Sequence, residues 1–233
     1  MNTRVTMPSI SIHEHSTYAR GDLEALIEQG GLHEFRQCDF SGADLSRLTM
    51  QGYCFQACQF AETSLYAAKL GDTVWRQCRA RQADFESAEL VDAVFVSCDL
   101  NNSTWRRAKL ASASFDMSKL TGASFEEVSH LGLSFRNSLL AGADLRGMSF
   151  RKAHLLELDF SGADLSGCDF REAIFEGGSL GNIQMRQTRF DGADLRSVNL
   201  AGLTLTDVKP FKGAMISARQ AADLLGGLGL VVA

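Results

Sequence analysis

Residues 35–60 read FRQCD-FSGAD-LSRLT-MQGYC-FQACQ-F, and a large apolar residue opens every group of five. The same phase continues to Leu205, and Phe, Leu, Met or Trp fills 33 of its 35 positions. Only Ala80 and His130 depart from it. Fourteen of the 15 phenylalanines and both tryptophans belong to this phase. Because proteins bury large apolar side chains, these positions point inward, and residues 33–207 form one repetitive unit.

The position two residues before each large residue is small. Ala, Cys, Ser, Thr or Gly occupies 25 of these 35 positions. A period of five matches neither the helical turn nor the alternation of a strand, so neither element keeps this phase buried. A square coil does, because four groups make a turn of about 20 residues, and successive turns stack at the ~4.8 Å spacing of neighbouring strands. The sequence predicts an all-β solenoid.

Four cysteines lie 20 residues apart in the small inward phase, at Cys38, Cys58, Cys78 and Cys98. Such a column spreads the thiols along an axis, whereas zinc needs ligands that converge on one point. We therefore interpret them as small hydrophobes and expect no metal site. Cys168 has the same phase on another face, and Cys54 alone points outward.

The composition disfavours several classes of function. The net charge is −5, whereas proteins that bind nucleic acid directly usually carry a basic excess. No run approaches the ~18 apolar residues of a membrane helix, and residues 1–18 lack a signal-peptide core, so we expect a cytoplasmic protein. The sequence contains no nucleophile elbow, no glycine-rich phosphate loop and no metalloprotease helix motif. His13 and His15 lie in a tail that is expected to be mobile. We expect that the protein is not an enzyme and that it binds no cofactor.

Both ends of the predicted solenoid carry a candidate capping helix. Residues 22–29 place Leu23, Leu26 and Ile27 on one side and end at Gly30. Near the other end, Ser217 and Gln220 have the spacing of a capping box. The leucines that follow at helical spacing are Leu224, Leu225 and Leu228, and an apolar strand is expected over residues 230–232. The expected division is a tail and capping helix over residues 1–32, repeats over 33–207, and a helix and strand over 208–233.

Five groups read Ala-Asp-Leu or Ala-Asp-Phe, beginning at Ala43, Ala83, Ala143, Ala163 and Ala193. This pattern resembles the pentapeptide-repeat superfamily, whose consensus is Ala, Asp or Asn, Leu or Phe, and two variable residues. The resemblance implies a right-handed quadrilateral β-helix with short N- and C-terminal capping helices.

The C-terminal stretch, residues 214–232, resembles more narrowly the terminal helix and strand of the quinolone-resistance (Qnr-type) members of that superfamily. Residues 38–46 and 78–85 resemble the same group. The resemblance implies a homodimer joined through the C-terminal module, at Ala221, Leu224, Leu225, Leu228 and Leu230. It also implies binding to type II topoisomerases, DNA gyrase and topoisomerase IV, and their protection from quinolones or natural-product poisons, as in antibiotic resistance or in the immunity protein of a producer.

The family's usual explanation is mimicry of DNA, which requires acidic surface. The face centred on Leu45, Leu65 and Phe85 is the most acidic, with eight acids and five bases. Its candidate partner-binding residues are Asp84, Glu86, Glu126, Glu127, Asp144 and Asp164. Duplex DNA carries roughly 24 charges over the ~40 Å of such a rod, so mimicry would have to use shape and local patches. The alternative is a solvated surface that keeps the rod soluble.

Two functions therefore remain open, a protector of topoisomerases and a non-catalytic interaction scaffold with no topoisomerase role. One irregularity lies at residues 128–133, where His130 takes an inward position and Leu131 an outward one. It is interpreted either as a small bulge with a hydrogen-bonded histidine or as a functional loop.

Overall fold

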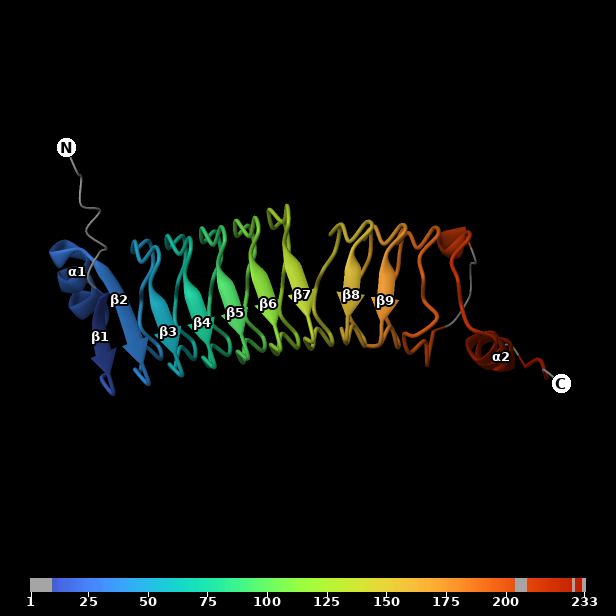
Figure 1. The fold of residues 1–233 in the computed structure, drawn as a ribbon, viewed down its shortest axis with the longest axis horizontal. Coiled ribbons are helices and arrows are strands. Elements are labelled where there is room, and N and C mark those ends of the chain that lie inside the picture. Colours follow the sequence, from blue (N-terminus) through green and yellow to red (C-terminus); the bar gives the residue numbers. More distant parts are fainter. Residues whose placement is uncertain (1–9, 204–208, 228, 232–233) are drawn as a thin grey trace, which may run out of the picture.

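The computed structural model describes residues 10–203, 209–227 and 229–231. They form a rod in which one short strand per coil lies on the same face (Figure 1). The elements in chain order are β1 (Ile10–Glu14), α1 (Arg20–Gln29), β2 (Leu32–Arg36), β3 (Cys54–Gln56), β4 (Val74–Arg76), β5 (Val94–Val96), β6 (Ser114–Asp116), β7 (Ser134–Arg136), β8 (His154–Leu156), β9 (Ile174–Glu176), the 3-10 helix η1 (Lys209–Phe211) and α2 (Ala218–Gly227). The chain is a right-handed quadrilateral β-helix, as predicted.

The coils repeat every 20 residues on all four faces. From β2 to β7 the strands pair in parallel in the register Phe35↔Phe55 and Phe55↔Trp75. We name this strand-bearing side face 1. The other sides carry single parallel bridges at the same spacing, namely face 2 (Asp39↔Gln59), face 3 (Asp44↔Ser64) and face 4 (Thr49↔Lys69).

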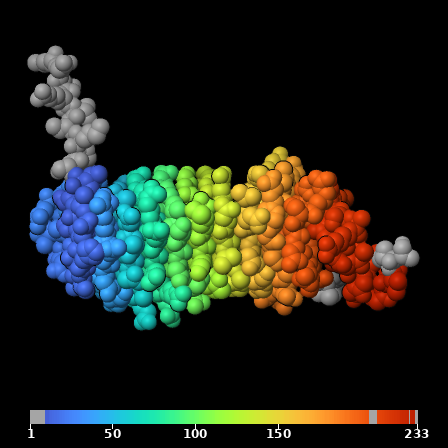
Figure 2. All heavy atoms as spheres, turned by 60° about the horizontal axis from the view of Figure 1, so that its bottom comes forward, coloured from blue at the N-terminus to red at the C-terminus, as the bar shows by residue number. Residues whose placement is uncertain are grey.

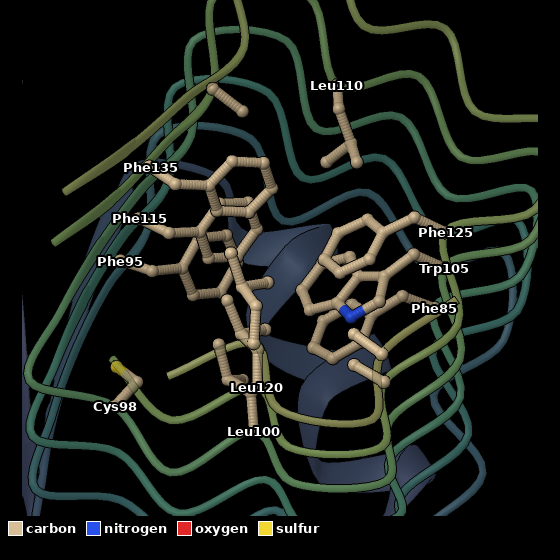
Figure 3. Packing of buried hydrophobic residues seen from close by; sticks show 14 of the residues in the cluster. Phe85, Phe95, Cys98, Leu100, Trp105, Leu110, Phe115, Leu120, Phe125 and Phe135 are labelled. Atoms are coloured by element: carbon tan, nitrogen blue, oxygen red, sulfur yellow. The ribbon is translucent and has the colours of Figure 1, made fainter. Parts of the chain in front are cut away.

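The axis of the rod is filled by stacked rings (Figure 3). On face 3, the ring of Trp105 stacks on that of Phe85, with centroids 4.0 Å apart. On face 1, Phe115 stacks on Phe95 at 4.8 Å and meets Trp105 edge to face at 5.3 Å. Buried indole nitrogens need acceptors, and Trp105 Nε1 donates to Ser103 Oγ in the small phase. Large residues on the axis and small polar ones beside it therefore satisfy packing and hydrogen bonding together.

The departure at Ala80 follows from the size of its neighbour. Trp75 lies 4.4 Å from Phe55 and 4.7 Å from Phe60, measured between ring centroids. Ala80 is fully buried and occupies the position one coil above Phe60. Because the indole already covers this part of the axis, a methyl group completes the packing.

The inward cysteines are free and do more than fill space. Cys58 Sγ donates to the carbonyl of Phe35 at 3.3 Å, and Cys78 Sγ to that of Phe55 at 3.3 Å. Thr63 makes the same bond to Phe40. Burial raises the pKa of the Cys168 thiol to about 12, so this group stays protonated. Several polar residues of the small inward phase thus satisfy a carbonyl 23 residues earlier, and others, such as Ser103, bond to a carbonyl close by in the chain.

The N-terminal end corrects one expectation. Residues 10–14 are not a mobile tail but strand β1, which pairs in parallel with β2. The register Ile10↔Leu32 and His13↔Phe35 has an offset of 22 rather than 20. Helix α1 replaces half of this first coil and buries Leu23, so the period of five is lost there and the sequence pattern could not reveal the strand.

The imidazole of His13 is part of this end of the core. It stacks on the ring of Phe35 at 4.8 Å, and its Nε2 lies 2.9 Å from Nδ1 of the buried His33. Burial lowers the pKa of both histidines, and the proximity of His33 lowers that of His13 further. The neutral pair therefore fits the fold better than a charged one.

The predicted capping box of the C-terminal helix is confirmed. The backbone N–H of Gln220 donates to Ser217 Oγ at 3.2 Å, and Ser217 N–H donates to Gln220 Oε1 at 2.6 Å. Gln220 Nε2 also donates to the carbonyls of Leu195 and Val198, so α2 closes the last coil. No helix in the described ranges is long and apolar enough to cross a bilayer.

Part of the expected C-terminal module lies outside the described residues. This applies to Leu228, to residue 232 of the expected strand and to residues 204–208 at the expected end of the repeats. Leu230 and Val231 are described and do not form a strand. A strand needs a neighbour to pair with, and none of the described segments lies against these two residues as one.

Candidate interaction surfaces

The six acids predicted to bind a partner all lie on face 3, in four of five consecutive coils. They are Asp84, Glu86, Glu126, Glu127, Asp144 and Asp164. The aspartates hold their own turns, because Asp84 accepts the N–H of Glu86 at 2.8 Å and Asp164 that of Ser166 at 2.9 Å. Asp44 and Asp169 do the same in other groups. The aspartate of the repeat therefore stabilises its own turn, and this structural role does not depend on binding to another protein.

Arg146 lies beside three of these acids. Its guanidinium makes two hydrogen bonds to Asp144, at 2.8 and 2.6 Å, and lies 3.8 Å from Glu126 and 3.9 Å from Asp164. The hydrogen bonds that Arg146 donates to Asp144 lower the pKa of that carboxyl group, and the same bonds raise the pKa of Arg146. The Asp144 carboxylate is therefore held ionised, and all three acids already have a cation beside them.

Two further arginines pair with the three glutamates of this set. Arg107 lies 3.2 Å from Glu86 and 3.6 Å from Glu127, and Arg106 lies 3.5 Å from Glu126. Six acids and three arginines leave a net charge of −3 over five coils. Face 3 is therefore a network of ion pairs rather than a uniformly acidic strip. Glu127 is the most exposed of the six predicted acids, with 59% of the side chain accessible.

The irregularity predicted at residues 128–133 is a break in the ladder. Strand β7 pairs with β6 but not with β8, which pairs only with β9 among the described strands, and a wider gap separates β7 from β8 in Figure 1. In the coil below, the N–H of Ser129 donates to the carbonyl of Ala108. The corresponding N–H of Ser149 donates instead to His130 Nε2 at 3.1 Å.

His130 takes the place of a backbone hydrogen bond. Its Nδ1 lies 3.2 Å from the carbonyl oxygen of Val128, which this ladder bond would otherwise use. Since Nε2 accepts from Ser149, the neutral ring carries its proton on Nδ1 and donates it to Val128. The histidine is thus hydrogen-bonded at both nitrogens but only half-buried. The next residue, Leu131, is 85% exposed.

The predicted dimerisation residues divide between two environments. Leu224 packs against the core and lines a small apolar cavity with Leu203 and Phe211, so it belongs to the lid of its own chain. Ala221 is half-buried, whereas Leu225 is 38% and Leu230 56% exposed. The exposed pair, not Leu224, is available to a second copy.

Two family models match the chain. The first, described as a pentapeptide repeat region, matches residues 49–125, and the second, described as pentapeptide repeats in eight copies, matches residues 132–167. The chain is a pentapeptide-repeat protein. The interval between the two matches, residues 126–131, contains His130 and Leu131. The repeat pattern and the β-ladder are thus interrupted at the same place.

Several solved structures share the fold. A trypsin-treated variant of QnrB1, described as a plasmid-mediated fluoroquinolone resistance protein, aligns with a TM-score of 0.73 and 23% identity, over 87% of this chain and 100% of that one. Full-length QnrB1 gives 0.59 and 22%, over 95% and 100%. HetL, involved in heterocyst differentiation regulation in the cyanobacterium Nostoc, gives 0.54 and 22%, over 87% and 84%. A comparison with curated protein sequences found no match.

Proposed function

We propose that this protein binds a bacterial type II topoisomerase, DNA gyrase or topoisomerase IV, and protects it from a quinolone or a natural-product poison. The observation that carries the proposal is the alignment with QnrB1, which spans that entire chain at a TM-score of 0.73. A likeness of this extent supports the same use of the whole rod. We further propose that the role is non-catalytic, because the inward side chains are locked in packing and the outward ones lie on convex walls.

The proposed contact surface is face 3, and Glu126 and Glu127 are its leading candidates. Both glutamates are more exposed than Asp144 or Asp164, and neither is needed by a turn of its own. The basic surface of the topoisomerase that normally binds DNA would offer its own cations to Glu126 and Glu127, in place of the arginines that pair with them in the free protein. A C2 homodimer through Leu225 and Leu230 would present two such faces to a two-fold enzyme.

The second candidate is an interaction scaffold with another partner. The partly neutralised charge of face 3 favours it, since three of the nine charged groups in its five central coils are cations. The similarity to HetL, a protein with a regulatory role, shows that the same fold is used elsewhere. In that case the exposed Leu131, beside the break in the ladder, is the most prominent apolar contact on the coils.

A supercoiling assay separates the two candidates. Purified gyrase is inhibited by a quinolone or, separately, by a peptide toxin, and this protein is added in increasing amounts. We expect supercoiling to be rescued by the unchanged protein and not by the double variant Glu126→Lys/Glu127→Lys. Glu62→Lys/Glu157→Lys is the matched control, because it makes the same charge change on exposed positions of faces 2 and 1.

Each result of this assay has one reading. If the double variant of Glu126 and Glu127 still rescues supercoiling, the topoisomerase remains the target, but face 3 is not the contact surface. Equal loss in both double variants would indicate that net charge, rather than a face, governs binding. No rescue and no binding to gyrase at about 10 μM protein, a concentration at which specific complexes form, would favour the scaffold.

A further inference from the structure

The N-terminal end of the sheet is an open edge. Strand β1 is the first of seven strands and pairs only with β2, and no described segment lies along its other side (Figure 1). In the regular coils, even-numbered strand residues direct their N–H groups to the preceding coil, as Val74 does to Tyr53. In the part of the chain that the structure describes, no coil precedes β1. The N–H and C=O groups of Ile10, Ile12 and Glu14 therefore point away from the sheet.

The side chains of this edge are unusually apolar for their exposure. Ile10 is 58% and Ile12 53% exposed, and their partners in the register with β2 are Leu32 and Glu34. Soluble proteins usually protect such edges with charged side chains, prolines or bulges. The only charge on β1 is Glu14, which lies 3.3 Å from Arg36 at the end of the strand. Among residues 10–203, 209–227 and 229–231, none lies on the outer edge of β1 where it would oppose the addition of another strand.

We propose that β1 pairs in antiparallel fashion with β1 of a second copy, joining two rods at their N-terminal ends. This interface is independent of the proposed topoisomerase function and of the C-terminal module.

A two-fold axis at Ile12 makes the edge self-complementary. Ile12 then faces Ile12 of the second copy, and Ile10 faces Glu14. All three residues have outward-pointing N–H and C=O groups, so each pair exchanges two hydrogen bonds. Ser16 Oγ already donates to the carbonyl of Glu14 at 3.0 Å, so this oxygen would accept the second bond with its other lone pair. The isoleucines at the centre form a β-branched cross-strand pair, and no like charges stand opposite each other.

The opposite end of the rod explains why the occupant is the same end of a second copy. Stacking head to tail would require an open coil at the C-terminus. There α2 covers the last coil, and Gln220 already binds the carbonyls of Leu195 and Val198 (Figure 2). A closed two-fold pair of N-terminal edges is the arrangement left to this surface. Because five residues bury far less than the ~1,200 Å² of a stable interface, we expect a weak dimer, forming at about 0.1 mM protein.

Sedimentation velocity of the full chain at concentrations from about 1 to 300 μM tests the proposal, a range that brackets weak association. Ile12→Lys places two ammonium groups opposite each other, and we expect the concentration needed for association to rise at least about tenfold. The control Ile174→Lys makes the same change on β9. Ile174 is 48% exposed, but its strand has a coil on either side and is not at an end of the rod. It should associate like the unchanged protein.

Leu225→Asp distinguishes this contact from the C-terminal one, because N-terminal association should persist in that variant. Amide hydrogen exchange of the unchanged chain gives a second readout that needs no substitution. Exchange at Ile12 should slow as the concentration rises, while that at Ile174 should not change. Identical sedimentation of the unchanged protein and Ile12→Lys, or exchange at Ile12 that is independent of concentration, would overturn the proposal.

Discussion

Replacing Phe115 by alanine tests the packing of the axis most directly. Phe115 is 1% exposed and stacks between Phe95 at 4.8 Å and Phe135 at 5.2 Å. Two further rings, Trp105 at 5.3 Å and Phe125 at 6.1 Å, contact it edge to face. The cavity left by the ring is closed above and below by stacked coils that cannot collapse into it. We therefore expect a loss near the upper part of the range for buried phenylalanines, about 4 kcal/mol in the free energy of unfolding.

Urea denaturation followed by circular dichroism measures this loss, and the fluorescence of Trp105 reports on the same coil. Met117→Ala is the matched control, because Met117 is 54% exposed on the next corner and its truncation should change stability by less than about 0.5 kcal/mol. Phe115→Asp adds an unpaired buried charge, and we expect it to prevent folding at a total stability of about 5–15 kcal/mol. A melting temperature of Phe115→Asp equal to that of the unchanged protein would refute the inward assignment of the phase.

Three further outcomes follow from particular contacts. His13 and His33 have lowered pKa values, so the unfolded chain takes up more protons below pH 6.5; urea midpoints should be constant above this pH and fall between pH 6.5 and 5. Gln220→Ala removes both bonds to the last coil and should cost about 1–3 kcal/mol, seen as faster amide exchange confined to α2 and that coil. His130→Ala leaves the N–H of Ser149 without its acceptor, and its exchange should speed up while that of Ser129 does not.

The fold could be predicted from the sequence because every coil buries the same arrangement of large and small side chains. A phase of large residues every five positions has only one way to remain buried, and residues such as Phe85, Trp105 and Phe125 stack as that phase requires. The caps obey other rules. β1 was missed because α1 takes up half of its coil, and its offset of 22 residues carries no period of five.

The surface was predictable only in outline. The sequence located the acids of face 3, but the pairing of Arg146 with Asp144, Glu126 and Asp164 depends on which side chains of stacked coils meet. The disturbance at His130 was visible as a misplaced residue. Its consequence is an imidazole in place of a ladder bond and a missing pairing between β7 and β8. This depends on how two adjacent coils meet in space, which the sequence pattern does not give.

The pattern of charges limits how this rod can imitate DNA. A duplex of the same ~40 Å length carries roughly 24 negative charges, and a protein that grips it releases a counterion for nearly every phosphate contact. Face 3 carries a net charge of −3. The side chains of its cations Arg106, Arg107 and Arg146 would have to leave their acidic partners before a basic surface could bind these acids. Binding to a DNA-shaped channel would then depend on the fit of a rigid rod and on a few exposed anchors such as Glu127. Its affinity should consequently fall with salt far less steeply than that of DNA for the same channel.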